Sequence, residues 1–311
     1  MVTCSACGTK VEEKFRFCPS CGQNMNAKNT VVTVCRHCGV RLRGTFRFCP
    51  SCGQKNEAFR EEKDIAVDRT KIRMIPVAAG SFTMGNARTR FLPVELPAFM
   101  ISSVPVIQMF YEKVMGCNPS KIKGTLNPVE SVSWFDAVIF CNRVSEMYGY
   151  KPCYSIDGET KLEKIEPSDS RWSGVACDFS ADGFRLPTEA EWEFAARGGE
   201  KFIYAGSDDV NEVAWYGENS DIQTHPVSEK KCNAFGIYDM SGNVEEWCND
   251  WAAQYGDTAQ SDPKGPETGT LRIKRGGCWL DDAQQCEIRA RSFAAPNAKA
   301  ANLGFRICRR Q

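Results

Sequence analysis

The first 52 residues carry eight cysteines in two tetrads with the same internal spacing. Each tetrad consists of two Cys-x-x-Cys pairs, and the members are Cys4, Cys7, Cys18 and Cys21, then Cys35, Cys38, Cys49 and Cys52. The offset is 31 residues, and the segment from Phe15 to Gln23 recurs unchanged from Phe46 to Gln54, which marks an internal duplication. Four thiolates from two such pairs form the closed tetrahedral site of structural Zn²⁺. The sequence therefore predicts two small units, each with one structural zinc ion.

Each unit is too short to fold on apolar burial alone, so metal binding has to supply its stability. We place the first zinc ribbon at residues 1–26, the second at 32–57 and a charged linker at 58–71, which leaves 72–311 for the main domain. The tetrads resemble the double zinc-ribbon modules that precede many unrelated bacterial domains, and such ribbons contact protein or nucleic acid. The alternative, a redox-active Cys-x-x-Cys motif, predicts one pair at a strand–helix turn and not a repeated tetrad.

The charge balance and the apolar pattern exclude several classes of protein. Basic and acidic residues number 39 each, so the bulk charge gives no reason to expect binding to nucleic acid or to an anionic membrane. The sequence predicts no membrane span, because no run approaches about 18 uninterrupted apolar residues, and it begins with no standard export signal. Zinc thiolates suit a reducing compartment, so we expect the protein in the cytoplasm.

The main domain combines a few helical patterns with many short strand-like runs. Apolar residues follow an amphipathic helical pattern over 105–115 and again from Ser133, which caps the helix, to Gly149. Thr188 begins a further helix with a capping box. We expect the acidic side chains of its first turns at the surface, where they favour the positive end of the helix dipole; they are Glu189, Glu191 and Glu193. The predicted fold class is α+β with little regular secondary structure.

Four strings in the main domain occur in the order and spacing of one known family. They are Gly183 to Glu193, Gly236 to Trp247, Arg275-Gly276-Gly277 and Leu303-Gly304-Phe305-Arg306. Together they resemble the formylglycine-generating enzyme family, also called the sulfatase-modifying factor family. The resemblance covers about Ile72 to Arg309 and implies a modified C-type lectin fold. It does not by itself imply catalysis, because one fold hosts many functions.

In the oxidase members, the resemblance implies two cysteines five residues apart that bind copper and oxidise a substrate cysteine. Aligned on the Arg-Gly-Gly string, the second position is Cys286 but the first is Asp281, and Cys278 replaces a serine. One thiolate cannot make the two-sulfur site that Cu(I) favours, and a carboxylate is a poor substitute. Cys278 paired with Cys286 or Cys308 would leave copper-dependent oxidation as the alternative function, with Cys286 and Cys278 as its catalytic residues.

The resemblance also implies a calcium loop. Its ligand pattern falls on the carboxylates of Asp239 and Glu246 and on the backbone carbonyls of Gly242 and Val244. Hard oxygen ligands that converge from a tight glycine loop are what Ca²⁺ requires. In the alternative interpretation, the two carboxylates cap the loop by accepting backbone N–H groups.

Residues 280–301 resemble the variable segments of diversity-generating retroelement target proteins, which also use this lectin-like fold. The resemblance implies fixed landmarks at Trp279, Ala283, Cys286, Arg291, Pro296 and Gly304-Phe305-Arg306. The changeable, ligand-contacting positions would be Leu280, Asp281, Asp282, Gln285, Arg289, Ala290, Ser292, Phe293, Ala294, Ala295, Ala298, Ala300 and Ala301.

Such a segment needs buried anchors, so that exposed side chains can change without unfolding the domain. The sequence therefore favours a noncatalytic binding protein that displays residues 280–301 to a protein or glycan ligand. Its expected metals are two structural zinc ions and one calcium ion, without copper.

Overall fold

The computed structural model describes residues 63–67, 70–86, 90–256 and 258–311, together with four short strands near the N-terminus. These strands are β1 (Val2–Thr3), β2 (Lys10–Val11), β3 (Val32–Val34) and β4 (Arg41–Arg43). The chain divides into two compact units, Met1–Glu61 and Glu62–Gln311. In the first unit, β1 pairs with β2 and β3 pairs with β4, both antiparallel. All eight cysteines of the predicted zinc sites lie outside the described residues.

The second unit begins earlier than the sequence suggested. The predicted linker 58–71 contains strand β5 (Lys63–Val67) and the start of β6 (Thr70–Val77), which pair antiparallel. β5 is an edge strand of a five-stranded sheet. Charged residues are typical of such edges, so the lack of apolar periodicity that suggested a linker is compatible with a strand.

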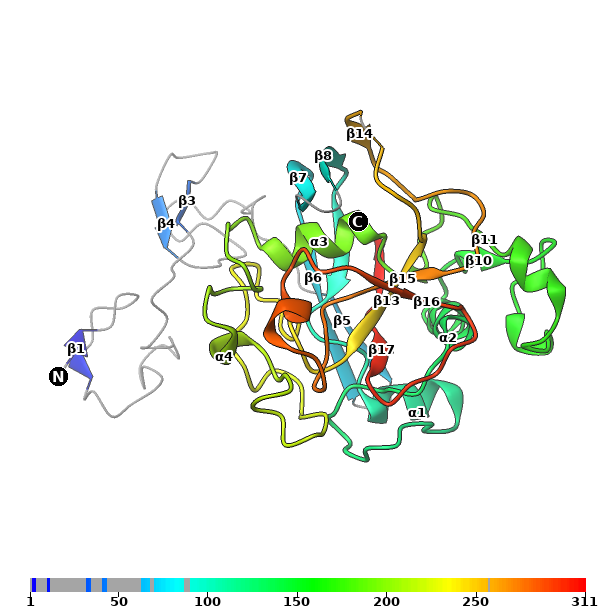
Figure 1. Ribbon diagram of the computed structural model, residues 1–311, viewed down its shortest axis with the longest axis horizontal. Coiled ribbons are helices and arrows are strands. Elements are labelled where there is room, and N and C mark those ends of the chain that lie inside the picture. Colours follow the sequence, from blue (N-terminus) through cyan, green and yellow to red (C-terminus); the bar gives the residue numbers. More distant parts are fainter. Residues whose placement is uncertain are drawn as a thin grey trace. The chain divides into compact units, whose positions relative to one another are not determined.

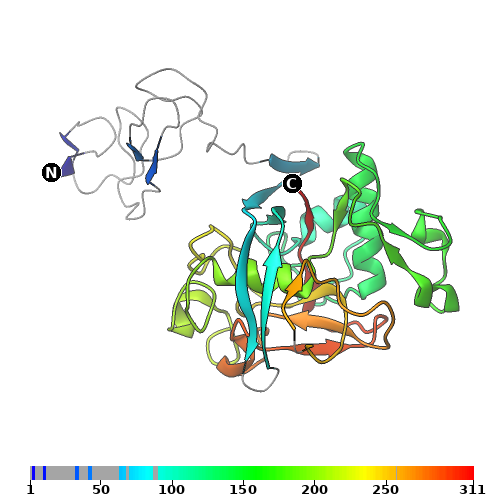
Figure 2. The same ribbon diagram turned by 90° about the horizontal axis from the view of Figure 1, so that it is seen from above.

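Three larger sheets form the frame of the second unit, and the orange and red strands of the four-stranded sheet run through its middle (Figure 1). The five-stranded sheet has the order β12 (Phe184–Arg185), β18 (Cys308–Arg310), β9 (Phe99–Ser102), β6 and β5. The four-stranded sheet has the order β16 (Ser292–Ala294), β15 (Arg272–Arg275), β13 (Glu245–Trp251) and β17 (Leu303–Phe305). The three-stranded sheet has the order β14 (Gln260–Ser261), β8 (Arg90–Leu96) and β7 (Gly80–Asn86), and β7 and β8 form a long hairpin (Figure 2). A small sheet pairs β10 (Tyr154–Ser155) with β11 (Ala176–Cys177).

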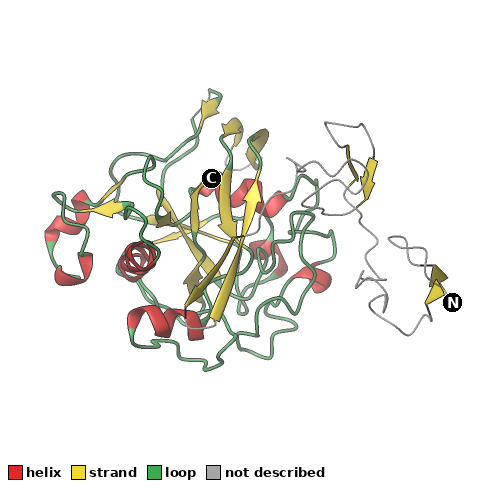
Figure 3. Cartoon of the chain, turned by 180° about the vertical axis from the view of Figure 1, so that it is seen from behind, coloured by secondary structure: helices red, strands yellow, loops and turns green. Residues whose placement is uncertain are grey.

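Short helices and long loops complete the unit (Figure 3). The α-helices are α1 (Gln108–Met115), α2 (Trp134–Met147), α3 (Glu189–Arg197) and α4 (Val210–Val213). The 3₁₀ helices are η1 (Leu162–Lys164), η2 (Ser170–Gly174) and η3 (Ala283–Cys286). The predicted caps are confirmed, because Ser133 and Thr188 each form a full capping box. None of the helices among the described residues is long and apolar enough to cross a membrane.

Two large apolar clusters make up most of the core. One surrounds α2, where the ring of Phe305 meets the ring of Phe140 edge-on at 5.2 Å. The other packs Trp192 of α3 against Ile273 of β15 and Ile101 of β9. The C-terminal strands therefore reach both clusters, and the segment between β15 and β17 starts and ends on fixed backbone.

Candidate recognition site

Residues 280–301, named here the recognition segment, lie between those two strands. None of the changeable positions predicted within it is buried. Leu280 and Phe293 are 60% and 56% exposed, respectively, although both are large apolar residues. By contrast, the landmarks Trp279 and Cys286 are 8% and 0% exposed. The structure thus separates exposed candidate contact residues from buried anchors along one stretch of chain.

Trp279 ties the two ends of the recognition segment together. Its backbone N–H donates to Asn243 O at 2.9 Å, and its indole Nε1 donates to Ala301 O at 3.1 Å. Just before it, Gly277 has φ +66°, and a Cβ there would lie 2.8 Å from Cys286 Sγ. Glycine is therefore required for the segment to fold back this closely.

The side chain of Arg275, in β15, binds the backbone in the middle of the recognition segment. Its side chain is fully buried and forms an ion pair with Glu193 of α3. The same guanidinium donates to Ala290 O at 2.5 Å and to Ile288 O at 3.1 Å. These bonds fix the backbone and leave the side chain of Ala290 uninvolved, as a replaceable position requires.

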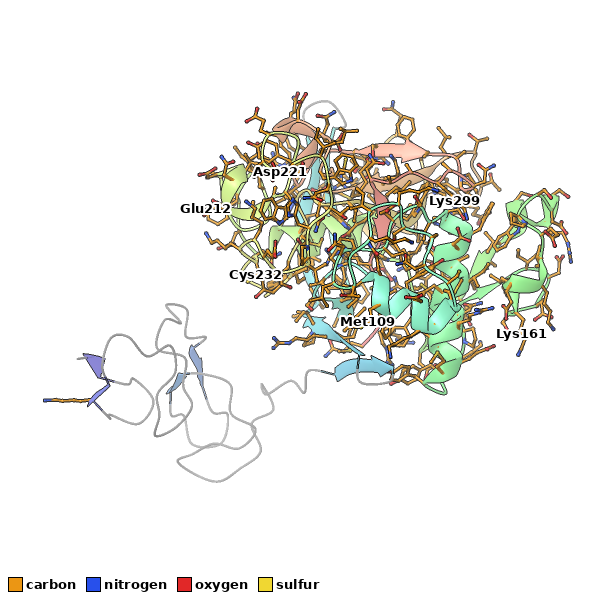
Figure 4. The ribbon with its side chains drawn as sticks, turned by 90° about the horizontal axis from the view of Figure 1, so that it is seen from below. Met109, Lys161, Glu212, Asp221, Cys232 and Lys299 are labelled. Atoms are coloured by element: carbon orange, nitrogen blue, oxygen red, sulfur yellow. The ribbon has the colours of Figure 1, made fainter. Side chains whose placement is uncertain are left out.

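Arg291 provides a second attachment to α3. Its Nε and Nη2 donate to the two carboxylate oxygens of Glu189 at 2.5 and 2.8 Å, and Nη1 donates to Ala253 O at 2.7 Å. At the far end, Lys299 Nζ lies 2.7 Å from Asp136 Oδ2, in the first turn of α2; Figure 4 labels Lys299 beside this helix. Charged contacts therefore attach the recognition segment to two helices.

The expected surface position of the acidic residues of α3 is wrong. Glu189, Glu191 and Glu193 are 3%, 1% and 0% exposed, respectively. Each carboxylate accepts hydrogen bonds from an arginine side chain. Glu191 accepts two, from Nη1 and Nη2 of Arg185, at 2.6 and 2.7 Å. Buried carboxylates require such partners. Arg185, in the same string as these glutamates, and Arg275, in another, supply two of the partners.

The predicted calcium ligands do not fit a calcium site in this arrangement. Glu246 is fully buried, and its oxygens accept Arg306 Nε at 2.6 Å, Arg306 Nη2 at 2.8 Å and Trp192 Nε1 at 2.7 Å. The guanidinium already supplies the positive charge that Ca²⁺ would bring. Asp239 accepts the backbone N–H of Ser228 at 2.9 Å.

The carboxylate of Asp239 is also buried. Burial raises the pKa of Asp239 to about 6, against the lowering effects of the Ser228 N–H and Arg306. No group of three or more histidine, cysteine or acidic residues suited to a metal occurs among the described residues, which do not include the zinc ribbons. The other two predicted calcium ligands, Gly242 and Val244, are buried in the loop that follows Asp239.

Cys278 and Cys286 lie close to Asp281 beneath the start of the recognition segment. Burial, followed by the Asp281 carboxylate, raises the pKa of Cys278 to about 12. Burial, Asp281 and Cys278 together raise the pKa of the Cys286 thiol further. These raised pKa values disfavour the thiolate forms that copper binding needs. Cys308 packs elsewhere, with its Sγ 3.7 Å from Glu191 Oε2.

A pocket of about 260 Å³ opens beside the recognition segment. Four of the predicted contact positions line it, namely Asp281, Gln285, Ala290 and Ser292. Its charged lining residues also include Arg275 and Arg291, described above, and two that the sequence analysis missed, Glu245 and Lys274. The carboxylate of Glu245 and Nζ of Lys274 lie 2.5 Å apart. Neither residue has a local sequence signal, because both strands are rich in polar residues, β13 reading EEWCNDW and β15 reading RIKR. The pocket is suited to polar groups of a ligand.

Family models match both parts of the chain. The sulfatase-modifying factor enzyme 1-like domain matches residues 61–311, and the double zinc ribbon matches residues 4–53. The second match supports structural zinc in the N-terminal unit.

Proteins similar in sequence or structure include a chaperone protein, a formylglycine-generating enzyme and a variable protein. "Chaperone protein LppX" of Paenibacillus barcinonensis is 38% identical over 258 residues, which is 76% of this chain and 89% of that protein. The formylglycine-generating enzyme of Streptomyces coelicolor is 39% identical over 155 residues, or 43% of this chain and 49% of the enzyme, so that match spans about half of the enzyme. The solved structure of Treponema denticola variable protein 1 has a TM-score of 0.77 and 33% identity, covering 81% of this chain and 100% of that chain. The chain therefore belongs to the sulfatase-modifying factor enzyme 1-like domain family, with a double zinc ribbon at its N-terminal end.

Proposed function

We propose that the protein is a noncatalytic binding protein whose recognition segment contacts a protein or glycan ligand. The burial pattern carries this proposal. All the changeable positions retain solvent contact, whereas Trp279, Cys286, Phe305 and Arg306 are buried. A frame of this kind allows side-chain replacement without loss of the fold, and an enzyme active site does not need that property.

The exposed side chains around the recognition segment have the character of a binding surface. Leu280 and Phe293 are joined by Phe91 of β8, which is 55% exposed. The Arg289 guanidinium lies 5.9 Å from the centroid of the Phe91 ring. Aromatic and arginine side chains carry much of the energy of protein interfaces. Phe91 therefore extends the proposed surface beyond residues 280–301.

We further propose that this segment is the target of a diversity-generating retroelement. The similarity to a variable protein over 81% of this chain supports the assignment. The test is the DNA around the gene. A near-copy of its 3′ end that differs at adenines, beside a reverse-transcriptase gene, is the expected finding, and a neighbourhood without such a copy would contradict a local retroelement.

Combined replacement of Leu280→Ser, Asp282→Ala and Phe293→Ser is expected to leave the domain folded, because all three side chains are exposed. The changes at Leu280 and Phe293 should each stay within about 0.5 kcal/mol in the free energy of unfolding, and the change at Asp282, the N-cap of η3, should cost about 1 kcal/mol. Chemical denaturation checks this. Ile288→Ala is the matched change at a buried position of the same segment and should cost at least about 2 kcal/mol.

The binding part of the proposal is tested by displaying a library randomised at the changeable positions and selecting it against a panel of purified proteins and glycans. We expect specific binders whose clones keep the wild-type melting transition. If folded clones are recovered but none binds any member of the panel above background, the recognition surface is wrongly placed.

The alternative function, a copper-dependent oxidase, requires a pair of soft ligands. Restoring the pair with Asp281→Cys is expected to tighten Cu(I) binding by at least roughly tenfold, or about 1.4 kcal/mol, because a thiolate replaces a carboxylate beside Cys286. Competition with a chromophoric Cu(I) chelator measures this, and Asp281→Ser serves as the control. Wild-type protein that binds Cu(I) as tightly as the cysteine variant, and that consumes oxygen with a cysteine peptide, would favour the oxidase.

For the N-terminal unit we propose two structural zinc ions, held by the tetrads Cys4, Cys7, Cys18, Cys21 and Cys35, Cys38, Cys49, Cys52. The family match over residues 4–53 supports this. The ribbons would then serve as a tether or a second contact to protein or nucleic acid. Thiolate zinc sites suit a reducing compartment, which supports a cytoplasmic location.

A further inference from the structure

Arg272 of β15 is clamped between two tryptophan rings on the side of the domain that includes β10 and β11. Its guanidinium carbon lies 3.7 Å from the Trp134 ring centroid and 3.4 Å from the Trp251 ring centroid. The residue is only 4% exposed, and Nη1 donates to Asn249 O at 2.5 Å. Two aromatic faces stabilise a cation but cannot neutralise it.

The remaining edge of this guanidinium has no partner among the described residues. Nε is buried without a hydrogen-bond acceptor, and Nη2 makes no hydrogen bond. No carboxylate lies within ion-pair distance of Arg272 in the described part of the chain. Nε and Nη2 form the side of the guanidinium that presents two parallel N–H donors.

The nearby Asp250 is a weak counter-charge. Its Oδ2 accepts the backbone N–H of Glu189 at 2.9 Å, and burial followed by the charge of Glu189 raises its pKa to about 7. Burial lowers the pKa of Arg272 to about 9, so the guanidinium is still protonated at neutral pH. A buried cation whose charge is not balanced by a nearby anion favours the binding of an anionic ligand.

Arg272 lines a pocket of about 450 Å³ that also includes both tryptophans. Lys264 adds a second cation, with its Nζ 4.2 Å from the Phe179 ring centroid and paired with Asp262. Glu267 is the only acidic residue among those that line the pocket. Figure 1 shows the orange chain after β14 passing β10 and β11, which contribute the opposite wall. The pocket uses no residue of the recognition segment, so it is independent of the proposed function.

We propose that this pocket binds the carboxylate of an acidic side chain or small organic acid through the Nε and Nη2 edge of Arg272. A carboxylate matches two parallel N–H donors. The guanidinium lies between the rings of Trp134 and Trp251, so a flat carboxylate can share its plane more easily than a tetrahedral phosphate or sulfate.

The direct test follows the side-chain Nε–H resonance of Arg272 by NMR in the full zinc-loaded chain. Arg272→Lys removes this resonance and so assigns it. Acetyl-glutamate-amide is the probe, and acetyl-glutamine-amide is its neutral match. We expect the acid to shift the resonance to saturation and to bind at least roughly tenfold more tightly than the amide. Equal binding of acid and amide, or no shift with either, would overturn the proposal. Tighter binding of phosphate or sulfate would overturn the choice of carboxylate.

Gly174→Phe blocks the pocket without touching Arg272. Gly174 lines the pocket, and a Cβ there would meet no atom within 4 Å, so the domain should tolerate the new side chain. Ser168→Phe places the same ring at an exposed position nearby that does not line the pocket. We expect at least roughly tenfold weaker binding of acetyl-glutamate-amide in the first variant and wild-type binding in the second. Wild-type binding by a folded Gly174→Phe protein would show that the acid binds elsewhere.

Discussion

Replacing Arg306 with methionine is expected to lower the free energy of unfolding by about 3–5 kcal/mol, since it leaves the buried Glu246 carboxylate without its cation. Arg306 is fully buried and bidentate with Glu246, and it also donates to Ser102 O at 3.0 Å and Tyr238 O at 2.9 Å. It therefore joins β9, β13 and the loop before β13. Urea denaturation measures the loss, which is a large share of the roughly 5–15 kcal/mol that stabilises a typical domain.

Two further variants separate the ion pair from a general effect of removing an arginine. Arg310→Met changes an exposed arginine near the same chain end and should stay within about 0.5 kcal/mol of wild type. The double change Arg306→Met with Glu246→Gln should lose less than the sum of the single changes, by at least roughly 1 kcal/mol, because the two residues are in contact. Strictly additive losses would mean that Arg306 stabilises the domain through its backbone acceptors alone.

Gly242→Ala is expected to cost about 2–5 kcal/mol, since left-handed strain of about 1–2 kcal/mol adds to overpacking of about 1–3 kcal/mol. Gly242 has φ +75°, and a Cβ there would lie 2.3 Å from Trp215 O. The next residue, Asn243, accepts the backbone N–H of Trp279. We therefore expect the substitution also to loosen the start of the recognition segment, which hydrogen exchange at the Trp279 amide can measure.

Gly236→Ala is the matched control for this prediction. Gly236 has φ +80°, but a Cβ there would meet no atom within 4 Å. Only the left-handed strain applies, so the expected cost is about 1–2 kcal/mol. If the two glycine variants lose equal stability, the close approach to Trp215 has no energetic effect.

The helix ends were predictable because their determinants are local. Ser133 and Thr188 each satisfy backbone N–H groups within three residues, so the pattern in the chain contains the whole interaction. The landmarks of the recognition segment were also predictable, because Trp279 and Phe305 are large apolar side chains in strings that resemble a known family. The exposure of Phe293 followed only from the resemblance, because a phenylalanine side chain by itself would be expected in the core.

The sequence by itself determined the repeated cysteine tetrads, the capped helices, the family and the division of residues 280–301 into anchors and candidate contacts. The tertiary structure alone decided which carboxylates are buried, because charge pairing between residues far apart in the sequence has no local signal. Glu193 meets Arg275 across 82 positions and Glu246 meets Arg306 across 60 positions. The first pairing turns a predicted surface residue into a support of the recognition segment, and the second occupies a predicted calcium ligand. The same packing leaves Arg272 without a carboxylate partner among the described residues.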